Sequence, residues 1–117
     1  MSGGRYAYQS LDALLHAPAR LSIVTALYAN GAGLTFVELR DLCELSDGNL
    51  SRHLQRLEAE EVVQSEKDFV DRVPQTTLRM TKDGEARFER YVEQLRAIVE
   101  RDVPGEAVRS NPNLRLA

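Results

Sequence analysis

The chain has 117 residues, of which 43% are hydrophobic and 28% are charged, with a formal net charge of −3. A chain of this length forms one domain with a single core, and these fractions are ordinary for a soluble globular protein. Cys43 is the only cysteine, which excludes a secreted protein held together by intrachain disulfides. No apolar run approaches a membrane span and no signal peptide is expected, so we predict a cytoplasmic protein without a membrane partner.

Helices and one very short strand are expected in the first third of the chain. We expect residues 1–9 to be flexible and one domain to occupy residues 10–103. Ser10 can cap a short helix over residues 11–16, with its leucines facing inward. Pro18 suits the first turn of a second helix, because proline lacks the amide that this turn leaves unpaired. That helix ends near Asn30, before a two-residue strand at 34–35, and its apolar stripe comprises Leu21, Val24, Leu27 and Tyr28.

The stretch from Thr35 to Glu60 has the pattern of two short helices joined by a tight turn. Thr35 and Glu38 form a T-x-x-E capping box at the start of the first helix. Residues 44–46 are short enough to form the turn, and Ser46 is a good N-cap for the second helix. This is the layout of a helix-turn-helix, which inserts its second helix into DNA. The apolar contacts of the first helix are expected from Phe36, Val37, Leu39, Leu42 and Leu45.

The second helix separates apolar side chains from polar ones. Leu50, Leu54 and Leu57 follow one another at spacings of four and three, so they share one buried face. On the other side, Arg can bind guanine edges or phosphates, Asn and Gln can pair with adenine, and a glycine lets the backbone approach the duplex. The alternative is an ordinary solvated helix face. The predicted DNA-binding residues of this helix are Asp47, Gly48, Asn49, Ser51, Arg52, Gln55 and Arg56.

The order of charges along the second helix favours entry into a groove. The cations Arg52 and Arg56 precede the acids Glu58, Glu60 and Glu61. The helix dipole alone favours the opposite order, with acids early and cations late. The observed order therefore costs some intrinsic helix stability, and insertion of the N-terminal half into DNA would explain it.

A strand pair is expected after the helix-turn-helix. Residues 62–67 and 76–80 have the composition of two antiparallel strands, with Leu78 and Met80 on one face. The residues between them, 68–75, are expected to form a loop that is stopped by Pro74. A helix-turn-helix followed by such a hairpin is a winged helix, so the predicted fold is mainly α with a small β-hairpin.

The wing carries charges of both signs. Lys67, Arg72 and Arg79 would be offered to phosphates or to the minor groove. Asp68 and Asp71 would repel the same phosphates. A hairpin that only covers the core is therefore the alternative to a DNA-contacting wing.

A long amphipathic helix is expected at the end of the domain. Thr81 caps it, and it runs from Lys82 to about Asp102. Its apolar stripe is longer than a three-helix core needs, and the surplus packs most simply against a second copy in a two-fold dimer. The alternative is a helix that folds back on its own domain. Residues 104–117 are expected to be flexible, and the predicted dimer interface comprises Phe88, Tyr91, Val92, Leu95, Ile98 and Val99.

Three stretches carry the most distinctive patterns: LDALLHAPARLSIVTAL, FVELRDLCELSDGNLSRHLQRLEAEEVV and RVPQTTLRMTKDGEARFERYV. Together they resemble the MarR/ArsR-like winged-helix transcriptional regulators, in particular the small winged-helix DNA-binding domain proteins of bacteria and archaea. SDGNLSRHLQRLE is the most specific part. The resemblance covers roughly residues 10–100 and implies a homodimeric DNA-binding regulator. It implies recognition by the seven residues named above for the second helix and a wing contact by Arg72, whereas the acidic Asp68 and Asp71 depart from the pattern.

Other kinds of site are not indicated. Cys43 is alone, and His16 and His53 have no nearby cysteine or carboxylate pattern, so neither a metal nor another cofactor is expected. Asp41 and Glu44 beside Cys43 would raise its pKa, which argues against a redox switch. No set of nucleophile, base and orienting group is present, and no phosphate loop, so we do not expect an enzyme.

The leading hypothesis is a dimeric, sequence-specific transcriptional regulator, a repressor, that binds double-stranded DNA. Six basic and seven acidic residues lie between positions 46 and 82, so binding must depend on how charge is distributed. An unidentified small-molecule effector between the last helix and the motif would act by changing the spacing of the two recognition helices. Arg52, Asn49 and Gln55 would read base edges, while phosphates would be held by Ser51, Arg56 and Arg72.

The second hypothesis is a winged helix that binds protein rather than DNA. The acidic balance of the chain is its main support. A titration of duplex DNA at low and moderate salt separates the two hypotheses, because a DNA binder must weaken as salt rises.

Overall fold

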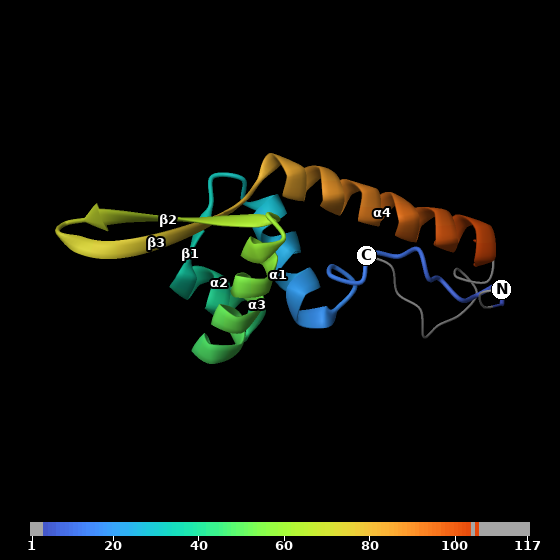
Figure 1. Cartoon of the computed structure of the whole chain (residues 1–117), viewed down its shortest axis with the longest axis horizontal. Coiled ribbons are helices and arrows are strands. Elements are labelled where there is room, and N and C mark those ends of the chain that lie inside the picture. The colour runs from blue at the N-terminus through green and yellow to red at the C-terminus, as the bar shows by residue number, and fades with distance from the viewer. Residues whose placement is uncertain (1–3, 104, 106–117) are drawn as a thin grey trace.

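Four helices and a three-stranded antiparallel sheet make up the part of the chain that the structure describes, residues 4–103 and 105. The structure is a computed structural model. Figure 1 shows the β2–β3 hairpin projecting from one side of the cluster of α1, α2 and α3, while α4 runs along the other side. In chain order the elements are α1 (Pro18–Ala29), β1 (Leu34–Thr35), α2 (Phe36–Cys43), α3 (Asp47–Ala59), β2 (Val63–Val70), β3 (Val73–Met80) and α4 (Lys82–Asp102).

This arrangement confirms the predicted winged helix-turn-helix. The strands are ordered β1-β3-β2, and β1 pairs antiparallel with the inner end of β3. No helix among the described residues is long and hydrophobic enough to cross a bilayer. The tail expected to be flexible, residues 104–117, lies outside the described residues except for position 105, and residues 1–3 also lie outside them.

One hydrophobic core joins the three-helix cluster, the inner end of the sheet and α4. Each fully buried leucine-sized side chain stabilises the fold by about 1.5–3 kcal/mol, so this core supplies most of the favourable free energy. The leucine triad of α3 is buried, as predicted. The largest fully buried side chains are Tyr91, Leu15, Ile23, Leu27, Leu39, Leu50, Leu57, Leu78, Val24 and Val62.

The helix starts are set by side-chain caps. Thr35 Oγ1 accepts from the Glu38 amide at 3.1 Å, and Glu38 Oε1 accepts from the Thr35 amide at 2.9 Å. Ser46 Oγ accepts from the Asn49 amide at 3.2 Å at the start of α3. Thr81 caps α4 in the same way. These contacts satisfy amides that a helix start leaves unpaired, and they confirm the three predicted start points.

The first turn of α4 lies against the backbone that joins α3 to β2. A Cβ atom added at Gly84 would lie only 2.1 Å from the Val62 carbonyl oxygen. The same oxygen accepts from the Thr81 amide at 3.0 Å. Glycine is therefore required at position 84 by this close approach, which sets where α4 begins relative to the end of α3.

The predicted helix over residues 11–16 is wrong, because this segment forms a series of turns. The Asp12 carboxylate accepts from the amides of Leu14 at 3.0 Å and Leu15 at 3.3 Å, which holds the chain in a tight turn. Ala17 is extended, with φ −146° and ψ 128°. A proline ring disfavours helical backbone in the residue before it, so the turn cannot continue through Pro18 into α1. Leu14 and Leu15 are nevertheless buried as expected.

The predicted loop over residues 68–75 is also wrong. Strands β2 and β3 pair along their full lengths and are joined by a two-residue turn, Asp71-Arg72. Pro74 lies within β3, opposite Phe69. β1 covers only the inner end of β3, so the outer part of β3 has a free edge where a missing amide costs no ladder hydrogen bond.

Two predicted core contacts of α2 are exposed. Val37 is 52% exposed and Leu42 is 63% exposed, whereas Leu39 is fully buried. Val37 precedes Leu39 by two residues, which places the two side chains nearly on opposite sides of the helix. Leu42 instead lines a groove between α1 and α2, beside Leu21.

Candidate nucleic-acid interface

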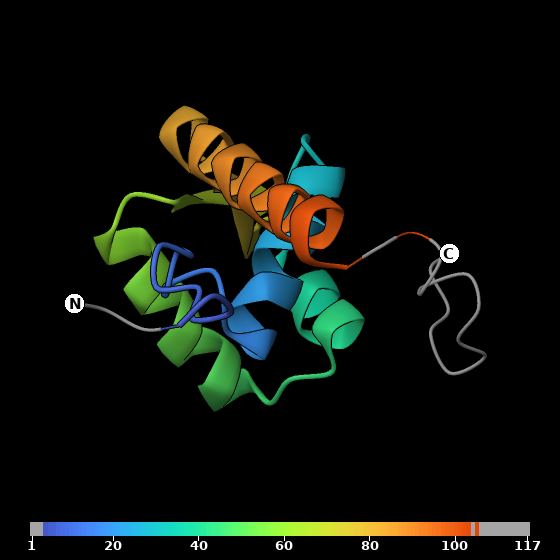
Figure 2. The same ribbon diagram turned by 90° about the vertical axis from the view of Figure 1, so that its right-hand side faces the viewer.

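α3 has one buried face and one exposed face. Its leucine triad packs into the core, and Figure 2 shows the helix on the outside of the three-helix cluster. This placement leaves a continuous polar face open to a partner. All seven residues predicted for recognition are exposed on it: Asp47, Gly48, Asn49, Ser51, Arg52, Gln55 and Arg56.

Two of the predicted base-reading residues contact each other. Arg52 Nη2 donates to Asn49 Oδ1 at 2.9 Å, as expected for residues three apart on one helix. Bidentate pairing with adenine needs both the oxygen and the nitrogen of the Asn49 amide, and the oxygen is already engaged. Arg52 keeps other donors of its guanidinium fork. The contact therefore favours a division of roles in which Asn49 orients Arg52.

The first turn of α3 is fastened to the last turn of α2 by a residue that the sequence analysis missed. Arg40 Nη1 lies 3.0 Å from Asp47 Oδ1, and Arg40 Nε lies 3.0 Å from Asp41 Oδ1. Hydrogen bonds to Asp47 and then to Asp41 raise the pKa of Arg40. The tight turn between the helices brings these groups together. The pairing also offsets the Asp47 charge, which would otherwise repel phosphate.

Apart from Arg79, the basic residues predicted to contact DNA have no carboxylate partner among the residues that the structure describes. Within residues 4–103 and 105, ion pairs engage Arg5, Arg40, Arg79, Arg87, Arg96 and Arg101. Several acidic residues are therefore engaged in ion pairs with arginines elsewhere in the fold. The exposed cations left without an acidic partner include all four that were predicted for the interface: Arg52, Arg56, Lys67 and Arg72.

The tip of the wing is a two-residue turn with an unusual backbone. Asp71 has φ 53° and Arg72 has φ 67°, the pattern of a type I′ hairpin turn. Glycine is favoured at the second position, because the left-handed region costs other residues about 1–2 kcal/mol. An arginine therefore occupies the outermost point of the hairpin at a cost in stability. Figure 1 shows this tip at the far end of the molecule from α4.

Arg79, which the sequence analysis offered to phosphates, is engaged inside the protein. Its Nε donates to the Ala32 carbonyl at 2.9 Å, and its Nη1 pairs with Glu66 at 2.8 Å. These contacts fasten the loop before β1 to the base of the wing. Arg79 therefore stabilises the wing, with its Nε and Nη1 atoms engaged inside the protein.

Neither His53 nor Cys43 has surroundings that suit a reactive site. Burial and the neighbouring Arg20, Arg52 and Arg56 lower the pKa of His53, which favours the neutral form of its imidazole in the free protein. Burial raises the pKa of the Cys43 thiol, which disfavours the reactive thiolate. No group of three or more potential metal ligands occurs among the residues that the structure describes.

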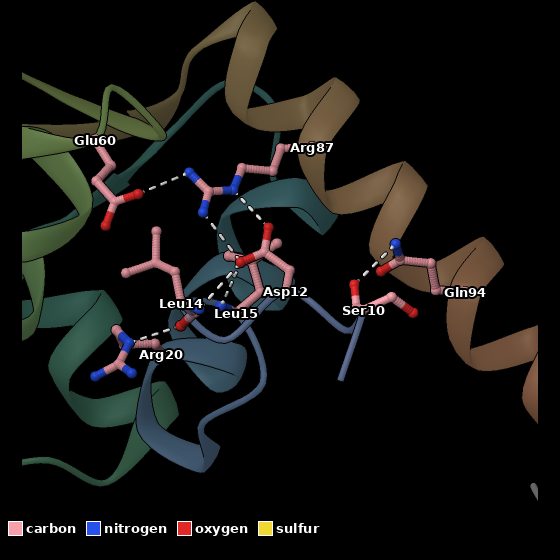
Figure 3. Close-up of polar contacts among 8 residues, drawn as sticks. All are labelled: Ser10, Asp12, Leu14, Leu15, Arg20, Glu60, Arg87 and Gln94. Atoms are coloured by element: carbon pink, nitrogen blue, oxygen red, sulfur yellow. Dashed lines mark hydrogen bonds and ion pairs between the residues drawn. The ribbon is translucent and has the colours of Figure 1, made fainter. Parts of the chain in front are cut away.

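An ion-pair network connects α3, α4 and the N-terminal segment (Figure 3). Arg87 on α4 binds the Asp12 carboxylate through Nε and Nη2, and its Nη1 lies 3.1 Å from Glu60 Oε1 at the end of α3. Burial raises the pKa of Asp12, but the hydrogen bonds and charge of Arg87 outweigh it, so the pKa is lowered. No spacing in the sequence predicts a contact between residues 12 and 87. The network holds the recognition helix at a defined angle to α4.

The apolar stripe of α4 is divided between the core and the surface. Phe88 and Tyr91 are buried within the protomer, and the Tyr91 hydroxyl lies 2.7 Å from His16 Nδ1. Val92 and Leu95 pack against the edge of the core, while Val99 is 43% exposed. The apolar surface that a second copy could cover therefore lies in the second half of α4, at Val92, Leu95, Ile98 and Val99.

Comparison with known proteins agrees with this geometry. The winged helix DNA-binding domain family matches the chain over residues 19–99. An uncharacterised protein of Methanocaldococcus jannaschii is 28% identical over 85 residues, which cover 70% of this chain and 88% of that protein. Among solved structures, a transcriptional regulator homologue of Pyrococcus horikoshii has a TM-score of 0.69 and 29% identity, over 74% of this chain and 85% of its own.

A MarR family transcriptional regulator of Silicibacter pomeroyi shares the fold with a TM-score of 0.58 and 22% identity, over 81% of this chain and 64% of that longer one. The family match spans all the elements from α1 to α4 except the first residue of α1 and the last residues of α4. The chain belongs to the winged helix DNA-binding domain family, and it shares the fold of a MarR family regulator.

Proposed function

We propose that this protein is a homodimeric repressor that binds specific sequences in double-stranded DNA by inserting α3 into the major groove. The observation that carries the proposal is the distribution of charge. In a chain with a net charge of −3, Arg52 and Arg56 on α3 and Lys67 and Arg72 on the wing have no acidic partner among residues 4–103 and 105. Cations that are free to neutralise phosphates release the counterions condensed on DNA, and this release favours binding.

Within α3 we assign base reading mainly to Arg52. A guanidinium can donate two parallel hydrogen bonds to the O6 and N7 atoms of guanine, and the Asn49 contact holds the side chain in place for this. Gln55, on the same exposed face, is the candidate for adenine. Ser51 and Arg56 would bind phosphates that fix the position of the helix in the groove. The expected half-site therefore contains a guanine beneath Arg52.

The wing would reach the neighbouring minor groove through Arg72. An arginine inserted there responds to the width and the negative potential of the groove rather than to individual bases. An arginine whose backbone is in the left-handed region costs stability at this turn. A functional contact would explain why arginine is present there. Lys67, on β2, would bind a phosphate beside it.

A two-fold dimer would place two copies of α3 about 34–36 Å apart, one helical turn of DNA. The exposed apolar surface on the second half of α4 is the proposed interface. Because Arg87 connects α4 to the end of α3, any small molecule that shifts α4 would also change the angle of the recognition helix. Such an effector would regulate DNA binding by changing the spacing between the two recognition helices.

The test is selection of bound sequences from a random duplex pool, followed by titration of the selected duplex. We expect a palindromic sequence with half-sites one turn apart, and an affinity that falls steeply between about 50 mM and about 200 mM salt. Arg52→Ala should abolish specific binding and leave dimerisation intact. The matched control is Arg90→Ala, which removes an equally exposed arginine from α4.

Equal binding by the wild type and Arg52→Ala would refute the role assigned to Arg52. A selected duplex without two-fold symmetry would refute the dimeric reading. Salt-independent binding, or no binding at all, would refute the DNA-binding function as a whole.

A second candidate function is binding to a protein partner, which one observation favours. The wing exposes apolar side chains, among them Phe69 at 69% and Val73 at 62%, and a groove of about 560 Å³ runs from the wing to the start of α2. Exposed apolar patches of this kind often mark protein interfaces. The same salt titration separates the two functions, because an apolar interface does not weaken as salt rises.

A further inference from the structure

Arg20, at the start of α1, lies outside every predicted contact yet is held in a fixed position. Its Nε donates to the Leu14 carbonyl at 2.7 Å, and Leu14 is buried in the core. Figure 3 shows the terminal nitrogens of Arg20 pointing away from the Asp12–Arg87–Glu60 network. Its other donors are therefore free, and no carboxylate among the described residues pairs with them.

His53, on α3, lies near enough to Arg20 at the start of α1 for the charge of Arg20 to act on it. It is half-buried, and neither of its ring nitrogens has a hydrogen-bond partner among the described residues. Both views of the fold show the start of α1 beside α3 (Figures 1 and 2). The charged groups that act on His53 are Arg20 from α1 and Arg52 and Arg56 from α3, all of them cations.

A cluster of cations around His53 is unusual in an acidic chain. Most other arginines of the described residues lie within ion-pair distance of a carboxylate. Here the charges of three guanidinium groups act on one imidazole and disfavour its protonation. The nearby start of α1 adds to the positive potential, because its N-cap, Ala17, provides no side-chain cap. An anion bound at this place would offset the repulsion among the guanidinium groups.

We propose that Arg20 and His53 bind one backbone phosphate of DNA beside the groove that α3 enters. Arg20 donates from its free guanidinium nitrogens, and His53 donates from its ring when protonated. Arg56, further along α3, would bind a phosphate of the same DNA backbone. The inference rests on the proposed DNA-binding function and extends the interface from α3 and the wing to a third element, α1.

The proposal predicts a sequence-independent contact. Arg20→Ala should lower the affinity for the selected duplex and for an unrelated duplex by the same factor, roughly tenfold at low salt. The slope of log affinity against log salt should fall by about one, because one phosphate contact is lost. Arg90→Ala, with the same change in charge on α4, should alter neither quantity.

Protonation of His53 gives an independent readout. A phosphate beside the imidazole favours its charged form, so binding takes up a proton and affinity should rise as pH falls from about 7.5 to about 6. In His53→Gln this rise should be lost, while the affinity at the higher pH changes little. The other histidine, His16, is present in both proteins, so the comparison isolates the effect of His53.

The outcomes separate this inference from the function on which it rests. If the wild type shows no salt-dependent binding, the DNA-binding function itself fails. If the wild type binds but Arg20→Ala keeps its affinity and slope, as Arg90→Ala does, the Arg20 contact is refuted. If His53→Gln keeps the full pH dependence, His53 has no part in the phosphate contact. Thermal unfolding of each variant, unchanged from the wild type, excludes a folding defect as the cause.

Discussion

Two glycines in helices should respond in opposite ways to the same substitution. At Gly84 a new Cβ atom would lie 2.1 Å from the Val62 carbonyl oxygen and 2.8 Å from its carbon. These are backbone atoms, and the oxygen also accepts from the Thr81 amide, so they cannot move without disturbing the start of α4. At Gly48 the new atom would meet nothing within 4 Å.

The magnitudes follow from packing and from helix propensity. Forcing an extra carbon into a packed contact costs about 1–3 kcal/mol, and more where backbone must shift. Alanine is favoured over glycine in a helix by at most about 1 kcal/mol, so Gly84→Ala should be destabilising overall by about 1–2 kcal/mol. Gly48→Ala lacks the clash and should stabilise the fold by up to about 1 kcal/mol.

Thermal and urea unfolding followed by circular dichroism measure both effects. For a domain of this size, 1 kcal/mol corresponds to a change in Tm of about 4–8 °C, so the two variants should differ by roughly 10 °C. DNA affinity gives a further contrast, because Gly48 lies on the exposed face of α3 and added bulk there should weaken binding. Equal stability of Gly84→Ala and the wild type would show that α4 does not approach Val62 as closely as described.

Three further predictions concern the dimer, the wing and the ion-pair network. Leu95→Glu should yield monomers by light scattering, and a dimeric Leu95→Glu protein would exclude α4 as the interface. Arg72→Gly should raise stability by about 1 kcal/mol through the positive φ of that residue and weaken DNA binding; unchanged affinity would mean that the wing tip does not contact DNA. Arg87 lowers the pKa of Asp12 below its ordinary value of 3.8, so the stability that their pair provides is present above that pH and lost as pH falls through the lowered pKa. Asp12→Asn should therefore unfold with a weaker dependence on acid in urea at about pH 2–4, whereas an unchanged dependence would show that the pair contributes nothing to acid stability.

The parts of the fold that sequence predicts well are those set by neighbours in the chain. The capping residues Thr35, Ser46 and Thr81 mark helix starts through contacts three residues long, and the leucine spacing of α3 reports its buried face directly. Local rules are sufficient there, because the interacting groups are brought together by the helix itself.

The errors arose where local rules competed. Pro74 suggested the end of a strand, but β3 has a free edge at that point, which only the sheet topology reveals. Residues 11–16 have a helical composition, yet the extended residue before Pro18 separates them from α1. In the candidate site, the exposed residues of α3 were named from their pattern. The roles of Arg20, Arg40 and Arg87 were missed, because their partners come from other segments of the chain.

The ion pairs explain how an acidic chain can present a basic face. Asp12, Glu66 and Asp102 each bind an arginine that lies away from the exposed face of α3, so much of the negative charge is neutralised where it also stabilises the fold. The Coulomb repulsion among the free cations of α3 is then not offset within the protomer. This repulsion lowers the stability of the free protein, and a bound anion would relieve it. At a fixed DNA concentration, binding should therefore raise the unfolding temperature more at low salt than at high salt, because the affinity for DNA itself rises as salt is lowered.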